Sequence, residues 1–287
     1  MRSRAALADL YELTKPGITR LVLITTAVGF YLGSSGSLDW VLLLNVLLGT
    51  GLLAAGTNAL NQWAERGVDA EMKRTRGRPL PAGRLRSSTA LVFSVGISVA
   101  GTVYLALLVN LLTSFLGAAA LLIYIFAYTP LKRRSWWCTV VGAVPGAIPP
   151  MMGWTAVTGS LDVLAWVLFG IVFLWQMPHF FAIGWIYRLD YARAGFPMLP
   201  VVDPEGVRTS RQIILYTLAL LMVSLLTSVL GLTGALYFFG ALTLGLAFLG
   251  LGMMLAVTRT GVHARRLFLG SVLYLPVLLI LMVVDKV

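Results

Sequence analysis

Three oxygen-bearing side chains, Asn61, Glu65 and Asp69, follow one another at intervals of four residues. Four residues turn an α-helix through about 400°, so successive side chains drift by only about 40° around its axis. On a helix that continues through Gly67, the three side chains therefore form a single stripe. Carboxylate and amide oxygens suit Mg²⁺, which proteins hold with a few carboxylates together with substrate phosphate oxygens. The stripe Asn61, Glu65 and Asp69 predicts a catalytic magnesium site for a phosphorylated substrate.

Basic residues crowd the segment that follows the stripe, and they include Arg74 and Arg78. Guanidinium groups hold phosphate oxygens strongly, so we expect both arginines to bind a diphosphate. The alternative is a solvated loop whose charges pair with one another, and it explains the basic cluster alone at least as well. It explains the stripe less well, because an ionisable group at the mouth of a membrane span is costly and marks function by default.

A second polar group, His179 and Asp190, lies about three helical turns apart near the end of a later apolar segment. We expect Asp190 to join the metal site and Arg193 to help bind the diphosphate. Pro178 should kink or end the regular helix. A core histidine bonded to a neighbouring helix and a surface salt-bridge cluster around Asp190 are the alternatives.

A third group, Tyr128, Lys132 and Arg133, precedes the glycine- and proline-rich segment 138–157. If the helix extends past Pro130, Tyr128 and Lys132 face one phosphate, and Arg133 adds charge beside them. A basic stop-transfer loop explains Lys132 and Arg133 equally well. In segment 138–157, small residues favour close helix packing, and the paired prolines are expected to break the helix beside a cavity.

The elements that position these residues are apolar segments long enough to cross a bilayer. The 287-residue chain is 59% hydrophobic and only 11% charged, with a mean hydropathy of +0.88. This composition excludes an ordinary soluble enzyme, and it predicts an all-α polytopic bundle of nine transmembrane helices that forms a single domain, 1–287. The split in the segment 89–130 rests on Asn110 and its polar neighbours alone. The predicted spans are 18–34, 40–62, 89–110, 113–130, 138–157, 163–185, 212–231, 234–257 and 267–284.

The positive charges test this topology independently. Of the 22 Lys and Arg residues, all except Lys286 lie before or at the start of the first predicted span, or in the loops that follow the second, fourth, sixth and eighth spans. The positive-inside rule therefore predicts a cytoplasmic N-terminus and an outward-facing C-terminus. The net charge of +11 is mostly an orientation signal, which argues against a nucleic-acid partner. The single cysteine, Cys138, excludes an internal disulfide and is expected to be a small core residue.

The motif Asn-x₃-Glu-x₃-Asp, followed by Met-Lys-Arg-Thr-Arg-Gly-Arg-Pro-Leu, resembles the first motif of the UbiA-type intramembrane prenyltransferases. Trp-Gln-x-Pro-His-Phe and Asp-Tyr-x-x-Ala-Gly-x-Pro-Met-Leu-Pro resemble the haem O synthase branch of that family. Leu13-Thr-Lys15-Pro16 also fits the resemblance, which covers nearly the whole chain. Glu65 departs from the usual aspartate but keeps a carboxylate. Cys138 stands where an asparagine is usual, and Asp190 lacks the companions of a full second aspartate motif.

The resemblance implies a UbiA-like enzyme that transfers a farnesyl group from farnesyl diphosphate to haem B, with Mg²⁺ as cofactor. It assigns His179 to the haem, by iron ligation or by a propionate hydrogen bond. It also implies a prokaryotic plasma (inner) membrane, and a haem A synthase or terminal-oxidase assembly partner. The alternatives are a UbiA-type enzyme acting on a quinone or phenolic ring, and a nine-span transporter. A fuller second aspartate motif would favour the former, and ionisable groups at the bilayer midplane would favour the latter.

Overall fold

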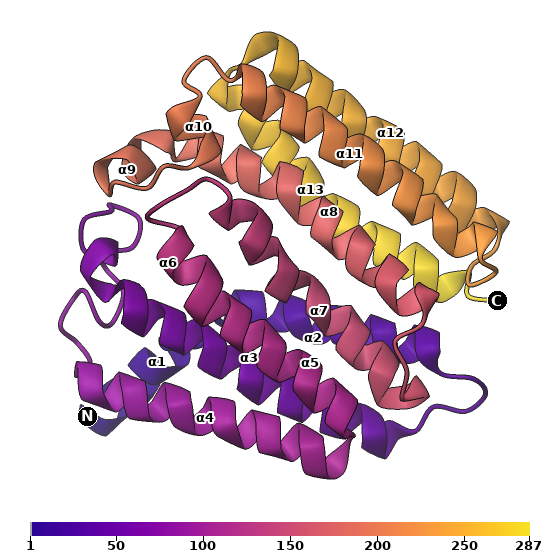
Figure 1. The fold of residues 1–287 in the computed structure, drawn as a ribbon, viewed down its shortest axis with the longest axis horizontal. Coiled ribbons are helices and arrows are strands. Elements are labelled where there is room, and N and C mark those ends of the chain that lie inside the picture. The colour runs from indigo at the N-terminus through magenta and orange to yellow at the C-terminus, as the bar shows by residue number, and fades with distance from the viewer. Residues whose placement is uncertain (1) are drawn as a thin grey trace.

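In a computed structural model, which describes residues 2–287, the chain forms a bundle of long helices (Figure 1). Within these residues, nine helical segments are long and apolar enough to cross a membrane, which confirms the predicted all-α class and the number of spans. Outward-facing side chains such as Leu44, Val92 and Phe239 are apolar and mostly exposed, as a lipid-facing surface requires. The spans are α2 (Pro16–Gly33), α3 (Trp40–Asp69), α4 (Ser87–Leu108), Leu111–Leu131, α7 (Cys138–Thr158), α8 (Val163–Ile186), α11 (Val207–Val229), α12 (Ala235–Thr258) and α13 (Gly261–Val284).

The predicted spans differ from the helices mainly where a helix continues into polar sequence. Helix α3 continues beyond the predicted end at residue 62, through Gly67, to Asp69. Helices α11 and α13 begin earlier than predicted. Hydropathy detects only the part of a helix that lies in hydrocarbon, so these polar ends were missed. The extension of α3 matters most, because it places the whole predicted stripe on one helix.

The predicted division of 89–130 is confirmed. Helix α4 ends at Leu108, and α5 (Leu111–Leu122) begins after Asn110, whose side chain accepts a hydrogen bond from the Thr113 N–H at 2.8 Å. Such a side chain satisfies one of the backbone donors that a helix start leaves free. The span continues through a π-helix, Ile123–Tyr128, and the short α6 (Thr129–Leu131).

The expectation that the paired prolines break their helix was wrong, and Pro178 does not end its helix. Helix α7 contains Pro145, Pro149 and Pro150 in its interior, and α8 runs through Pro178 to Ile186. A proline removes only one backbone donor, whereas an irregular segment inside the membrane leaves several groups without partners. Continuing the helix is therefore the less costly solution.

The predicted close packing of small residues is confirmed between α2 and α7. A Cβ added at Gly153 would lie 1.9 Å from the Thr26 carbonyl oxygen, and one at Gly29 would lie 2.0 Å from that of Pro150. The two backbones therefore touch, as glycine at a membrane helix interface allows. This contact fixes α2, whose N-terminal end carries part of the site.

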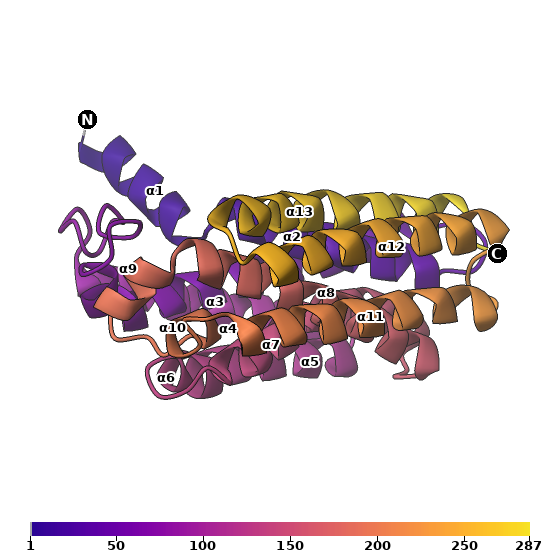
Figure 2. The ribbon, with the colours of Figure 1, turned by 90° about the horizontal axis from the view of Figure 1, so that it is seen from above.

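The bundle has two chemically different ends. Figures 1 and 2 show α1 (Arg2–Leu13), α6, α9 (Arg188–Arg193) and α10 (Leu199–Val202) gathered at the end where the described chain begins, with the C-terminus at the opposite end. We call these the loop end and the far end. Helix α1, which the sequence reading did not anticipate, is held to the α3–α4 loop by ion pairs of Arg84 with Asp9 and Glu12.

Candidate active site

A cavity of about 760 Å³ opens in the bundle toward the loop end. Its walls come from α2, α3, α5, the π-helix, α7, α8 and α13. The end nearest the loops carries charged side chains, whereas the deeper part is lined by residues such as Leu53, Met152 and Leu275. The cavity thus combines a polar end for a charged group with an apolar body for a hydrocarbon chain.

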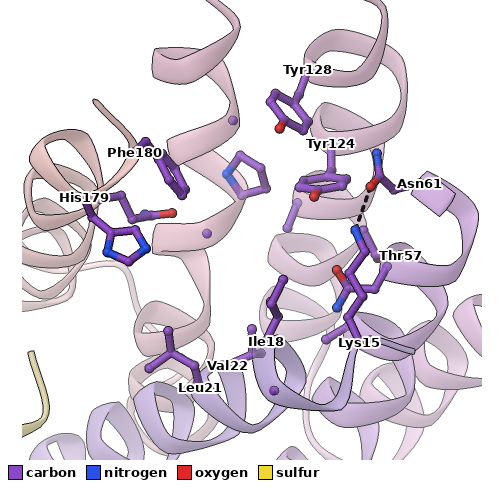
Figure 3. Close-up of a pocket in the computed structure, with 18 of the residues that line it drawn as sticks. Lys15, Ile18, Leu21, Val22, Thr57, Asn61, Tyr124, Tyr128, His179 and Phe180 are labelled. Carbon is purple, nitrogen blue, oxygen red and sulfur yellow. Dashed lines mark hydrogen bonds between the residues drawn. The ribbon is translucent and has the colours of Figure 1, made fainter. Parts of the chain in front are cut away.

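The predicted stripe lies on the cavity wall. Asn61, Glu65 and Asp69 all line the cavity, and their exposed fractions are 2%, 7% and 1%. Since α3 is continuous from Trp40 to Asp69, the helical spacing brings the three side chains to the same face, as expected. Figure 3 shows Asn61 on this wall, beside Lys15.

Each side chain of the stripe is paired with a cation from a different segment. The ammonium of Lys15 donates to Asn61 Oδ1 at 2.8 Å, and that of Lys132 donates to both Glu65 oxygens at 3.0 Å. Arg78 reaches Asp69 Oδ2 at 2.6 Å. Buried charges require such partners. The result is a compact array in which carboxylate and amide oxygens can bind a metal ion and the neighbouring lysine and arginine side chains can bind the oxygens of a diphosphate.

One oxygen of the stripe has no partner. Asp69 Oδ1 is buried and makes no hydrogen bond within residues 2–287. A buried carboxylate oxygen without a partner is costly, and it points to a ligand that supplies the missing contact. No three His, Cys, Asp or Glu side chains of the described residues cluster as a metal site, so a cation held by the stripe would need substrate oxygens to complete its shell.

Lys15 is the site residue that the sequence reading did not assign. It lies between α1 and α2 with φ of +46°, a left-handed conformation that costs a non-glycine residue about 1 kcal/mol. Gln62 of α3 holds the preceding turn by donating to the Leu13 carbonyl at 3.1 Å. Burial and the nearby Arg78 lower the pKa of Lys15 to about 7. A Lys-Pro pair at the mouth of an apolar span was the available signal.

Lys132 completes the polar end from the α6–α7 loop. Its backbone N–H donates to the Tyr128 carbonyl at 3.0 Å, so the helical turn past Pro130 that the sequence reading required is present. Burial alone would lower the pKa of Lys132, but the attraction of Glu65 and its hydrogen bonds outweigh burial and raise the pKa. The Phe196 ring lies 4.8 Å from the ammonium. Tyr128 and Lys132 both line the cavity, as expected.

The three functional loops meet over the cavity. Met72 of the α3–α4 loop, Cys138 at the start of α7, and Phe196 and Met198 after α9 form one buried apolar cluster. Cys138 is therefore a small core residue, as expected, although its side chain also lines the cavity. This cluster keeps the loops at one end of the bundle, which the composite site requires.

The structure does not bring every predicted residue to the cavity. Asn61, Glu65, Asp69, Arg74, Arg78, Tyr128, Lys132 and His179 line it. Asp190, Arg133 and Arg193 are not among the lining residues. Asp190 instead pairs with Arg193 at 3.2 Å on α9. Helix α8 ends before Tyr187 and a new helix begins, so that Tyr191, the residue after Asp190, lines the cavity in its place. The expected fourth metal ligand is thus outside the site in this conformation.

His179 lies on the opposite side of the cavity from the stripe. Figure 3 shows His179 and Phe180 facing Lys15, Asn61 and Tyr124 across the open space. The imidazole stacks on Trp175 with 5.1 Å between ring centroids. Trp175 and Phe180 line the cavity, whereas Phe181 is buried against Tyr216 instead. An aromatic wall therefore faces the charged wall.

Comparison with known proteins agrees with this geometry. Residues 22–278 match the UbiA prenyltransferase family. A protein of Solibacter usitatus named protoheme IX farnesyltransferase is 52% identical, over 97% of this chain and 98% of its own length. A protein of Koribacter versatilis with the same name is 41% identical, over 98% of this chain and 94% of its own length.

Solved structures share the fold at low sequence identity. Digeranylgeranylglyceryl phosphate synthase superposes with a TM-score of 0.82 at 17% identity, over 97% of this chain and 98% of its own. A UbiA homologue of Archaeoglobus fulgidus bound to DMAPP and Mg²⁺ gives 0.70 at 14% identity, over 96% and 99%. Because residues 2–287 contain nine helices apolar enough to cross a membrane, this chain is an integral membrane protein. It belongs to the UbiA prenyltransferase family.

Proposed function

We propose that this protein transfers a farnesyl group from farnesyl diphosphate to a vinyl group of haem B, forming haem O and releasing diphosphate. The observation that carries the proposal is the division of one cavity into a charged wall and an aromatic wall that bears His179. Strong similarity to proteins named protoheme IX farnesyltransferase supports the choice of substrates. The same similarity favours haem over a quinone or phenolic acceptor, and enzymatic transfer over transport.

The charged wall is proposed to hold the diphosphate. Asn61, Glu65 and Asp69 would hold Mg²⁺, which fits the partnerless Asp69 oxygen. When bound, Mg²⁺ neutralises diphosphate charge and so makes it a better leaving group. The bases that line this end of the cavity would bind the remaining phosphate oxygens, and they are Lys15, Arg74, Arg78 and Lys132. The hydroxyl of Tyr128 would donate a further hydrogen bond.

Roles for the three residues outside the cavity stay predictions. Asp190 as a ligand, and Arg133 and Arg193 as diphosphate contacts, would require the loops to close over the substrate. Tyr191, adjacent to Asp190, already lines the cavity, which supports this closure. Loss of diphosphate affinity in Asp190→Ala would support this role, and unchanged affinity would assign the residue to its ion pair with Arg193.

The chemistry requires an electron-poor centre that is kept away from bulk water. The carbon–oxygen bond of farnesyl diphosphate breaks, and the diphosphate leaves with the electron pair. The vinyl group of haem B attacks the allylic cation and forms the new carbon–carbon bond. One water molecule then captures the resulting cation and loses a proton, which leaves the hydroxyl group of haem O. The apolar body of the cavity excludes other water until that step.

The membrane setting follows from the same arrangement. We propose a single domain in the plasma (inner) membrane of a prokaryote, with the loop end and the N-terminus cytoplasmic and the C-terminus outside. The support is that the bases gather at the loop end. The product haem would pass to a haem A synthase or a terminal-oxidase assembly partner.

Incubation of the purified protein with haem B, farnesyl diphosphate and Mg²⁺, followed by mass analysis of the pigment, tests the proposal. We expect haem O, and we expect none without Mg²⁺. Parallel incubations with a quinone precursor and a phenolic acid test the alternative acceptors. A prenylated aromatic product together with unmodified haem would refute the proposal.

A further inference from the structure

A polar contact joins α8 to α13 on the aromatic wall of the cavity. His179 Nδ1 lies 2.7 Å from Ser271 Oγ, and the indole N–H of Trp175 donates to the Ser271 carbonyl oxygen at 2.8 Å. Ser271 is fully buried. Trp175 and His179 are one helical turn apart, so both side chains of this turn are fixed by a single residue of α13.

The proton of the Ser271 hydroxyl is already committed to another group. Ser271 Oγ lies 2.5 Å from the Phe268 carbonyl oxygen, and a carbonyl only accepts hydrogen bonds. A hydroxyl has one proton, so toward His179 its oxygen acts as the acceptor. His179 Nδ1 must therefore carry the proton, and Nε2 of the neutral ring carries the lone pair.

The other ring nitrogen is directed to no protein group. Within residues 2–287, Nε2 of His179 makes no hydrogen bond, and the side chain lines the cavity (Figure 3). The ring is held by Trp175, Phe180 and Phe268, at centroid distances of 5.1, 5.7 and 5.1 Å. An imidazole that is fixed in the aromatic wall of the cavity and has a bare nitrogen can coordinate a soft or borderline metal.

We propose that Ser271 is a positioning residue that holds His179 in the Nδ1–H tautomer, so that Nε2 is presented to the haem iron as an axial ligand. The iron in this statement rests on the proposed function, whereas the tautomer does not. Metal-bound histidines usually donate their other N–H to a protein acceptor, and loss of that acceptor costs roughly 10- to 100-fold in affinity or activity. The arrangement favours iron ligation over a propionate hydrogen bond, because a propionate requires a donor at Nε2.

The tautomer is measurable without haem. The chain has only two histidines, so protein labelled with ¹⁵N-histidine gives two sets of ring signals, and His179→Ala assigns them. We expect the bare-nitrogen shift at Nε2 of His179 in the wild type and in Ser271→Thr. In Ser271→Ala we expect a mixture of tautomers. A bare Nδ1 in the wild type, or a Ser271→Ala spectrum identical to that of the wild type, would overturn the proposal.

Ser94→Ala is the matched control. Ser94 is also fully buried, and its hydroxyl also donates to a helix carbonyl, that of Ala90, at 2.7 Å, but no histidine lies beside it. We expect Ser94→Ala to leave the His179 signals unchanged. If both serine variants altered the signals alike, the effect would be general loosening of the bundle, and the positioning role would be refuted.

Haem titration followed by absorption spectroscopy tests the iron contact. We expect a histidine-ligated spectrum in the wild type, its loss in His179→Ala, and a roughly 10- to 100-fold weaker affinity in Ser271→Ala. An identical haem spectrum in wild type and folded His179→Ala would refute ligation. Ligation by His179 without any farnesylated product would instead refute the proposed function and leave this inference standing.

Discussion

A lysine from outside helix α2 lies at each end of that helix, and the two lysines are used in opposite ways. At the far end, Lys286 donates to the carbonyl oxygens of Tyr31 and Ser34, where a cation stabilises a helix C-terminus. At the loop end, Lys15 lies before the first turn of α2, where the helix dipole disfavours a cation, and its backbone is left-handed. Lys286 serves the fold, whereas the position of Lys15 makes sense only for binding an anion.

The same contrast extends over both ends of the bundle. At the far end, polar side chains bind backbone groups: Asp39 accepts from the Leu42 N–H, Asp162 from that of Leu164, and Asp285 from that of Tyr237. At the loop end, the stripe binds only side chains and faces the cavity. A polar group bound to backbone is already used by the fold. The side-chain oxygens of the stripe accept hydrogen bonds from movable lysine and arginine side chains, so they remain able to exchange these partners for a substrate.

The largest expected effect is at the stripe. Asp69→Ala and Asn61→Ala should each lower kcat by at least roughly 10³-fold, because metal stabilisation of a leaving group is worth several kcal/mol. The measurement is turnover of detergent-purified protein at saturating Mg²⁺, with thermal melting as the check on folding. Glu65→Asp should be milder than Glu65→Ala, since it keeps a carboxylate. Near-normal turnover in either alanine variant would remove the metal assignment.

Lys15→Met should have the next largest effect. We expect kcat/KM for farnesyl diphosphate to fall roughly 10- to 100-fold, as expected for the loss of a hydrogen bond to a charged group. The melting temperature should not fall, because the native position of this ammonium opposes the helix dipole. Steady-state kinetics at several diphosphate concentrations give the first quantity. A destabilised variant with normal kinetics would make Lys15 a structural residue like Lys286.

The helix cap at Asp162 should show the reverse pattern. Asp162→Ala should lower the free energy of unfolding by about 1–2 kcal/mol, because the start of α8 loses its cap and Trp154 loses a hydrogen-bond partner. Unfolding in detergent measures the change, and Asp162→Asn serves as a control because asparagine also caps helices. We expect normal kcat in both variants. A large loss of turnover would break the division between the two ends.

The smallest expected effect is at Lys286. Lys286→Met should lower stability by about 0.3–1 kcal/mol, the usual worth of a cation at a helix C-terminus. Kinetic constants should be unchanged. The comparison with Lys15→Met is direct, because the same substitution is made in the two lysines that lie against opposite ends of α2.

The sequence was sufficient for the nine-span architecture because hydropathy acts over whole segments. It was also sufficient for the stripe, since helical spacing is a local property. Asp190 shows the limit of such local reasoning. The prediction that it shares a face with His179 assumed one continuous helix, but α8 ends before Tyr187. The prolines mislead for a related reason, because their effect depends on what surrounds the helix.

Residues brought together by tertiary packing could not be identified in the same way. Lys15 reaches Asn61 only because Gln62 holds the turn before α2. Ser271 lies far along the chain from His179, in the apolar part of α13, and no spacing relates the two. Such contacts follow from how helices pack, and a single sequence records that packing only weakly.

Binding of a non-reactive farnesyl diphosphate analogue tests the central claim most directly. Calorimetric titration of farnesyl thiodiphosphate into the wild type and Asp69→Asn, each with and without Mg²⁺, separates metal-dependent binding from simple charge attraction. We predict tight binding by the wild type that weakens at least about tenfold without Mg²⁺, and no Mg²⁺ dependence in Asp69→Asn. Equal Mg²⁺ dependence in the two proteins would contradict the claim that the stripe at the loop end holds the metal-bound diphosphate.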